Sequence, residues 1–211
     1  MLAVDPRTTE LIMPRIALLA LASAFVLACD RGGGSGDTSG AGDSATAAAN
    51  GCLTGAPTLT AGGIGPIRIG SPLSAAEGRC DMRDTSFTLS EGAQENGRVV
   101  DLGNGSVVVL TNAQGNVTRI IVEDSTVRAE RGLGVGSTVG DLRRTHGMLC
   151  AEEGEGVVVV SSGNLGAISF ATDADMRTVR RGASLDAEAI PDDARITRMW
   201  VYEGRALCGA S

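Results

Sequence analysis

The sequence predicts an α+β fold made of two tandem units, each a helix followed by an antiparallel sheet, whose strands together form one curved sheet. Two observations support this prediction. First, residues 67–76 align with residues 133–142 when the chain is shifted by 66 positions. Second, the spacing of apolar residues changes from helical to strand-like after each of these stretches. We therefore expect a first unit at 51–127 and a second at 128–211, behind a cleaved signal and a disordered linker.

The N-terminal stretch has the pattern of a secretory signal. Arg15 is followed by thirteen apolar or small residues at 16–28. That run is too short for a membrane-spanning helix, which needs roughly 20 residues. We expect residues 1–28 to be a cleaved signal peptide. Two acidic side chains lie before Met13, where a positive region is expected, so Met13 is the expected true start.

The signal ends in Val26-Leu27-Ala28-Cys29, which resembles the lipobox of bacterial lipoproteins. This resemblance implies that Cys29 receives diacylglycerol and becomes the new N-terminus. The alternative is an ordinary signal cleaved near Ala28, which would leave a free cysteine. Residues 29–50 follow, and after Cys29 they contain no aliphatic side chain larger than alanine, so we expect a disordered linker. The folded part is then anchored by lipid in the bacterial cell envelope and faces the periplasm or the exterior.

The first unit is expected to open with a helix of about ten residues. Ser71 can cap this helix, and Pro72 sits at the first helical position, where its missing N–H group costs nothing. A turn at 112–116 then joins two apolar runs into a hairpin. The strands expected in this unit are 87–89, 98–102, 107–110 and 117–122.

The second unit repeats this order. Thr138 and Asp141 match a capping box, and His146 followed by Gly147 is the usual end of a helix. A polar loop at 172–193 accounts for the greater length of this copy. The strands expected here are 157–160, 167–170 and 196–202.

Composition excludes several function classes. The net charge is −7, and all 18 basic residues are arginines. An acidic chain without a basic run is not expected to bind nucleic acid or anionic lipid. Without lysine there can be no Schiff-base or P-loop chemistry. His146 is the only histidine, so a histidine-based metal cluster is excluded. We predict no catalytic residue, no metal and no cofactor.

Four cysteines lie in the two units: Cys52, Cys80, Cys150 and Cys208. An even number of cysteines in an oxidising compartment predicts two disulfides, for which three pairings are possible. The alternative is a metal site, but the four residues are far apart in the sequence and form no C-x-x-C motif.

The motifs that open the two units, at 69–73 and 135–142, are each followed by a cysteine just after the helix. In this respect the chain resembles the small α+β modules of the beta-lactamase inhibitor protein and the BamE-like outer-membrane lipoproteins. The resemblance implies a curved sheet backed by helices that serves as a protein-binding surface and brings no catalytic residue. If each duplicated unit closes on itself, the disulfides are Cys52–Cys80 and Cys150–Cys208.

The last strand provides the candidate for a partner-binding site. Side chains alternate along a strand, so Ile196, Arg198, Trp200 and Tyr202 are expected on one face and Thr197, Met199 and Val201 on the other. Arg119 occupies the matching face of the first unit. Tryptophan, tyrosine and arginine dominate binding hot spots. We therefore predict a partner-binding patch, with the alternative that Trp200 is part of the core and the stem of Arg198 covers it. The predicted patch consists of Arg119, Arg198, Trp200 and Tyr202.

These observations predict a non-catalytic envelope lipoprotein that binds a protein or a cell-wall component. One alternative is a hydrolase with carboxylate catalysis, and a second is a purely structural envelope lipoprotein. An enzyme would present a deep pocket with carboxylates of perturbed pKa. A binding protein would instead present a broad, shallow aromatic patch.

Overall fold

The structure, a computed structural model, describes residues 52–53, 55–88, 92, 94–204 and 208. The predicted signal peptide, the lipidation site Cys29 and the predicted linker at 29–50 all lie outside the described residues. Within the described residues, no helix is long and apolar enough to span a membrane.

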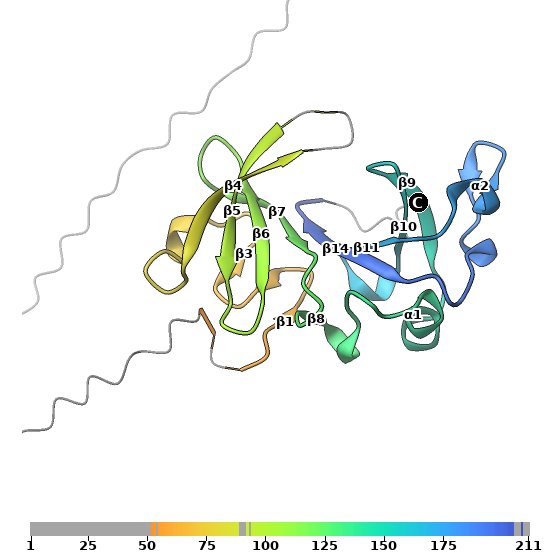
Figure 1. The fold of residues 1–211 in the computed structure, drawn as a ribbon, viewed down its shortest axis with the longest axis horizontal. Coiled ribbons are helices and arrows are strands. Elements are labelled where there is room, and N and C mark those ends of the chain that lie inside the picture. Colours follow the sequence, from red (N-terminus) through yellow and green to blue (C-terminus); the bar gives the residue numbers. More distant parts are fainter. Residues whose placement is uncertain (1–51, 54, 89–91, 93, 205–207, 209–211) are drawn as a thin grey trace, which may run out of the picture. The chain divides into compact units, whose positions relative to one another are not determined.

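An eight-stranded antiparallel sheet dominates the described part of the chain (Figure 1). Its strand order is β4-β5-β6-β7-β14-β11-β10-β9. The sheet thus consists of two four-stranded halves that meet where β7 pairs with β14. The strands are β4 (Met82–Thr88), β5 (Gln94–Asp101), β6 (Ser106–Thr111), β7 (Val117–Val122), β9 (Cys150–Gly154), β10 (Val157–Ser161), β11 (Ile168–Thr172) and β14 (Ile196–Tyr202).

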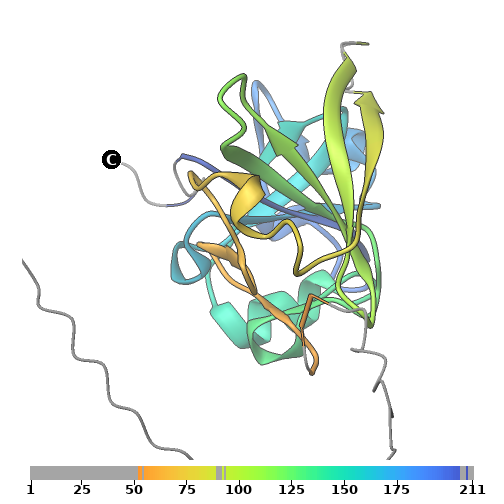
Figure 2. The same cartoon turned by 90° about the vertical axis from the view of Figure 1, so that its left-hand side faces the viewer.

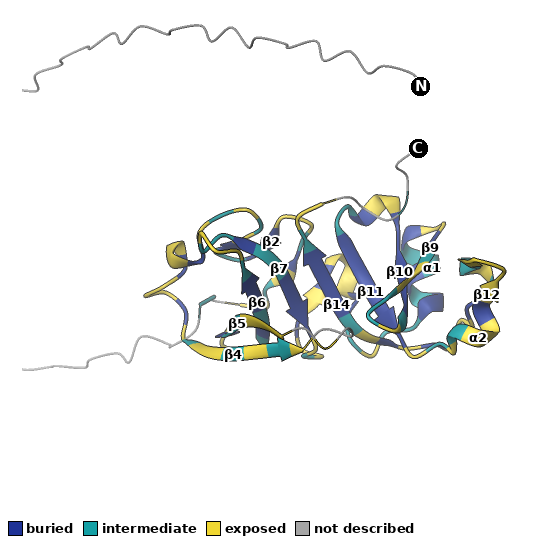
Figure 3. Cartoon of the chain, turned by 90° about the horizontal axis from the view of Figure 1, so that it is seen from above, coloured by how far each residue is buried: buried dark blue, intermediate teal, exposed yellow. Residues whose placement is uncertain are grey.

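Apolar alternation along the central strands gives this sheet two different faces. In β7, Ile120 and Val122 lie in the main core, whereas Ile121 lies in a second, smaller apolar cluster. In β14, Met199 and Val201 lie in the main core and Trp200 in the smaller cluster. Figure 3 shows these central strands as largely buried and β4 as largely exposed. The sheet therefore packs a large core on one face and a small aromatic cluster on the other.

Short elements cover the large core. Leu59, Ile64 and Leu142 from three of these elements are fully buried within it. The strands are β1 (Thr58–Leu59), β2 (Gly63–Ile64), β3 (Ile67–Arg68), β8 (Arg128–Ala129), β12 (Arg180–Arg181) and β13 (Ser184–Leu185). The helices and 3₁₀ turns are α1 (Val139–His146), α2 (Met176–Val179), η1 (Leu73–Ala75), η2 (Glu130–Gly132), η3 (Gly163–Leu165) and η4 (Ala187–Ala189).

The predicted fold class was wrong. The described residues are mostly β, with one eight-stranded sheet and three two-stranded ones, and their two α-helices span only eight and four residues. Both helices lie in the second half of the chain, so the described residues do not form two tandem helix-plus-sheet units.

The error lies in the first predicted helix. Where about ten helical residues were expected after Ser71, only the three-residue turn η1 forms, and it has no side-chain cap. Gly78 follows with φ of +79°, a left-handed conformation that interrupts a helix. Cys80 is then held by a disulfide to Cys52. Although residues 71–72 favour the start of a helix, no α-helix forms, because the backbone leaves the helical conformation after a single 3₁₀ turn.

The predicted capping box of the second helix is present. The Thr138 hydroxyl accepts a hydrogen bond of 3.1 Å from the Asp141 amide, and the Asp141 carboxylate accepts one of 2.9 Å from the Thr138 amide. Hydrogen bonds from this threonine lower the pKa of the Asp141 carboxyl. The box fixes the start of α1, which buries Val139 and Leu142 in the main core.

We expect Thr138→Ala to lower the free energy of unfolding by about 1 kcal/mol, because an alanine cannot accept the amide hydrogen bond at the start of α1. Urea unfolding followed by circular dichroism measures this change. Thr138→Ser keeps the hydroxyl and should retain most of the stability. Equal losses in the two variants would show that the hydroxyl does not act as a cap.

The structure joins Cys52 to Cys80 and Cys150 to Cys208. Each disulfide therefore lies within one of the two ranges predicted as units. The first links the segment before β1 to the residues just before the edge strand β4. The second links the start of the other edge strand, β9, to Cys208 near the C-terminus.

Candidate functional site

The sheet curls toward the face that carries the smaller cluster, which we name the concave face. Phe87 of β4 and Arg198 of β14 both lie on this face, and the guanidinium carbon is 5.4 Å from the ring centroid. Four strand-to-strand steps separate β4 from β14, a distance of about 19 Å in a flat sheet. The β4–β5 hairpin, which extends beyond its neighbours in Figure 2, must therefore curl over β14.

Gly97 of β5 makes this curl possible. A Cβ atom at this position would lie 2.7 Å from the Leu110 side chain and 2.9 Å from the carbonyl oxygen of Val109. Glycine inside a strand is typical of a bend or a close backbone approach. The side chain of Leu110 can thus pack directly over the backbone of β5.

The other end of the sheet also curls over β14. β9 and β10 are joined by a two-residue turn, Glu155-Gly156, in which both residues have positive φ, 51° and 76°. This conformation suits glycine and asparagine but strains a glutamate. From this turn the Glu155 carboxylate reaches Arg119 of β7 at 2.6 Å and Arg198 of β14 at 3.3 Å. The strained turn therefore places one carboxylate between two arginines at the centre of the sheet.

These residues form a cluster of alternating charge, which we name the arginine–glutamate cluster: Arg119, Arg198, Glu123 and Glu155. Arg198 also contacts Glu123 at 2.6 Å. The side chains of Arg119, Arg198 and Glu155 are 30%, 29% and 18% exposed, so these pairs are partly shielded from solvent. Partly buried pairs are screened less by salt than surface pairs. The cluster ties the β9–β10 turn to the central strands β7 and β14.

Trp200 lies beneath this cluster and is 5% exposed. Its neighbours in the small apolar cluster include Leu110, Ile121 and Val159. The Arg198 guanidinium lies 5.7 Å from the Trp200 ring centroid. This arrangement matches the alternative interpretation of the sequence, in which Trp200 belongs to the core and the side chain of Arg198 covers it. The indole Nε1–H of Trp200 is buried and finds no acceptor among the described residues.

The structure places all four residues of the predicted patch on the concave face. Tyr202 pairs directly with Arg119 across the β14–β7 ladder, and Trp200 pairs with Ile121.

The expected position of Ile196 on this face was wrong. The register shifts between Ala171 and Thr172, opposite Ile196 and Arg198, and Ile196 packs in the main core. A β-bulge therefore reverses the alternation at the start of β14.

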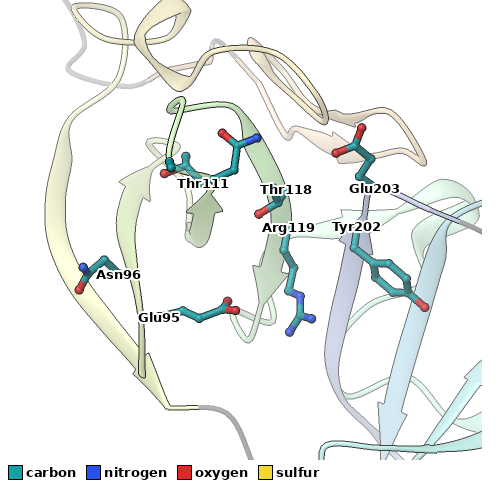
Figure 4. Close-up of a pocket in the computed structure, with 9 residues that line it drawn as sticks. Glu95, Asn96, Thr111, Thr118, Arg119, Tyr202 and Glu203 are labelled. Atoms are coloured by element: carbon teal, nitrogen blue, oxygen red, sulfur yellow. The ribbon is translucent and has the colours of Figure 1, made fainter. Parts of the chain in front are cut away.

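A hollow of about 720 Å³ opens beside the arginine–glutamate cluster. Figure 4 shows Glu95 of β5 pointing into it toward Arg119, with Tyr202 at the end of β14 on the other side. A smaller cavity of about 130 Å³ adjoins Trp200 and shares Arg119 and Tyr202 with the hollow. The hollow is lined by Glu95, Asn96, Thr111, Asn112, Ala113, Thr118, Arg119, Tyr202 and Glu203.

No protein-family model and no curated protein sequence matches the chain. Among solved structures, the chain is similar to the uncharacterized protein yfeY from Escherichia coli, with 19% sequence identity and a TM-score of 0.47. The alignment covers 69% of this chain and 99% of that one.

Several residues of the concave face were not singled out from the sequence. Phe87 fell within an expected strand, but its position over β14 depends on the curl of the sheet. Glu155 belongs to a Gly-Glu-Gly segment between two apolar runs, a pattern that indicates a hairpin turn without showing where the carboxylate points. Glu95 lies in a polar segment that gave no strand signal.

The described part of the chain contains no cluster of three or more histidine, cysteine or acidic residues able to hold a metal ion. Glu152, which lines the smaller cavity, is the one acidic group among the described residues whose pKa is raised, because desolvation disfavours its charged form. The pKa of Asp124, in the loop after β7, is lowered by hydrogen bonds from Thr126 and Ser106.

His146 lies outside the concave face, at the end of α1, and is 6% exposed. Burial, together with the nearby positive charge of Arg131, lowers the pKa of its imidazole. Its Nε2 atom has no hydrogen-bond partner among the described residues. Burial therefore disfavours the charged form of this imidazole.

We expect this burial to make the protein less stable in mild acid. The pKa of His146 is lower in the folded state than in the unfolded state, so its contribution is complete above about pH 6.5 and is lost as the pH falls below that value. Urea midpoints measured between pH 7.5 and pH 5 should decrease in the wild type. In His146→Phe this decrease should be smaller. An identical decrease in both proteins would contradict the assignment.

Proposed function

We propose that this chain is a lipid-anchored protein of the bacterial cell envelope that binds a protein or a cell-wall component without catalysing a reaction. The lipobox-like sequence ending at Cys29 supports the anchor. Two disulfides support an oxidising compartment outside the cytoplasm. The binding surface we propose is the concave face of the sheet together with the hollow beside the arginine–glutamate cluster.

The difference between the two faces of the sheet carries this proposal. Helices, turns and short strands cover one face and bury a large apolar core. The concave face instead combines a small apolar cluster with the charged side chains of Arg119 and Arg198 and the ring of Tyr202, which is only half buried. A sheet with a purely structural role would not need a cavity lined by these side chains. A curved surface with aromatic and arginine side chains around a cavity is typical of a recognition site.

Site-specific photo-crosslinking in the native envelope tests the proposed surface. A photoreactive amino acid at position 118, on the lining of the hollow, should give a crosslinked product. The same amino acid at the exposed position 193, next to the elements that cover the main core, is the matched control and should give none. Equal crosslinking at both positions, or none at position 118, would contradict binding through the concave face.

Metabolic labelling tests the proposed anchor separately. Cells fed with a radiolabelled or clickable fatty acid should incorporate the label into the wild-type protein. Cys29→Ser should abolish incorporation and release the protein from the membrane fraction. Labelling that persists in Cys29→Ser would show that Cys29 is not the lipidation site.

A further inference from the structure

We infer that the occupant of the hollow is an extended peptide segment of a partner protein that carries lysine or arginine side chains. This inference rests on the proposed function, because it names the chemical class of the partner that the concave face binds. Charge, aromatic surface and hydrogen-bonding capacity of the described residues each point to this class.

Three carboxylates around the hollow have no positive partner among the residues that the structure describes. Glu95 and Glu203 line the hollow and Glu152 lines the adjoining cavity, and none of the three forms a salt bridge with a described residue. The positive charge of Arg119 is already paired with Glu155 at 2.6 Å. Within the described part of the chain, the lining of the hollow therefore has an excess of negative charge.

This excess favours a positively charged ligand, because complementary potentials steer and orient association. The raised pKa of Glu152 is consistent with a carboxylate in a partly desolvated position that a nearby cation would stabilise. Tyr202 adds an aromatic ring between the two cavities, where a lysine or arginine side chain can make a cation–π contact.

The hydrogen-bonding groups of the lining suit a peptide backbone, and charge favours a peptide over a glycan. Asn96 and Thr111, on the lining of the hollow, offer an amide and a hydroxyl that can pair with backbone groups of an extended peptide. An N-acetylated glycan has carbonyl groups too but offers no positive charge to the carboxylates.

Selection from a random octapeptide library tests the inference on the immobilised full chain. Peptides retained by the wild type should be enriched in lysine and arginine. Glu95→Gln/Glu203→Gln should bind the selected peptides about tenfold more weakly, a difference of about 1.4 kcal/mol. The matched control Glu77→Gln/Asp193→Asn removes two exposed carboxylates that do not line the hollow and should bind as the wild type does.

Enrichment of acidic or uncharged peptides, or equal binding by the wild type and Glu95→Gln/Glu203→Gln, would overturn the inference. Displacement of a selected basic peptide by a soluble N-acetylated glycan oligomer, at concentrations where the peptide itself binds, would point to a cell-wall glycan and would also overturn it. If crosslinking at position 118 succeeds while the selection shows no basic preference, only this inference fails. If crosslinking at position 118 gives no crosslinked product and the selection retains no peptide, the proposed binding function fails as well.

Discussion

Replacing Cys150 and Cys208 together by serine is expected to lower the free energy of unfolding by about 4 kcal/mol. The disulfide between them closes a loop with a sequence separation of 58 residues, and a longer loop restricts the unfolded chain more strongly. The bond also ties the C-terminal segment to the start of β9, at the edge of the sheet. A single domain has only 5–15 kcal/mol of stability in total. Urea unfolding of wild type and variant measures the loss.

The Cys52–Cys80 disulfide provides an internal comparison. Its sequence separation is 28 residues, so Cys52→Ser/Cys80→Ser should cost slightly less, about 3.6 kcal/mol. Treating the wild type with a reductant should produce the combined loss of both double variants. If the reduced wild type unfolds at the same urea concentration as the oxidised protein, the disulfides do not stabilise this fold.

Much of the central sheet could be predicted from the sequence because its strands carry strong local signals. The apolar runs that became β6, β7, β10, β11 and β14 are rich in β-branched residues. The capping box at Thr138 and Asp141 likewise depends on residues three positions apart. Local patterns of this kind predict the native structure well because the residues involved are close in the sequence and also contact one another in the fold.

The first helix and the curl of the sheet could not be predicted in the same way. Ser71 and Pro72 favour the start of a helix, but the turn at Gly78 and the disulfide of Cys80 end it after three residues. Tertiary constraints commonly override such weak local preferences.

The candidate site depends on longer-range geometry. Arg198 contacts Phe87 from one end of the sheet and Glu155 from the other, although 111 and 43 residues respectively separate them in the sequence. Alternation along β14 was enough to place Trp200 and Tyr202 on one face. It could not show that two hairpins converge over that face, because strand order and curvature do not follow from the pattern of any one strand.

Phe170→Ala is expected to lower the free energy of unfolding by about 3–5 kcal/mol, because it leaves a large cavity in the main core. Phe170 of β11 is completely buried there, on the side of the sheet opposite the hollow. Urea unfolding followed by circular dichroism measures the loss. A small effect would show that the surrounding strands collapse into the space left by the ring.

Phe87→Ala is the matched control, because it removes the same side chain from the concave face, where Phe87 is half-buried against Arg198. We expect it to cost about 1 kcal/mol, since less apolar area is lost and no closed cavity forms. The two variants should also separate stability from binding. At temperatures where both remain folded, Phe170→Ala should retain crosslinking at position 118, whereas Phe87→Ala should weaken it because the β4–β5 hairpin loses its contact with β14. The reverse result would mean that the curl of the sheet does not shape the binding surface.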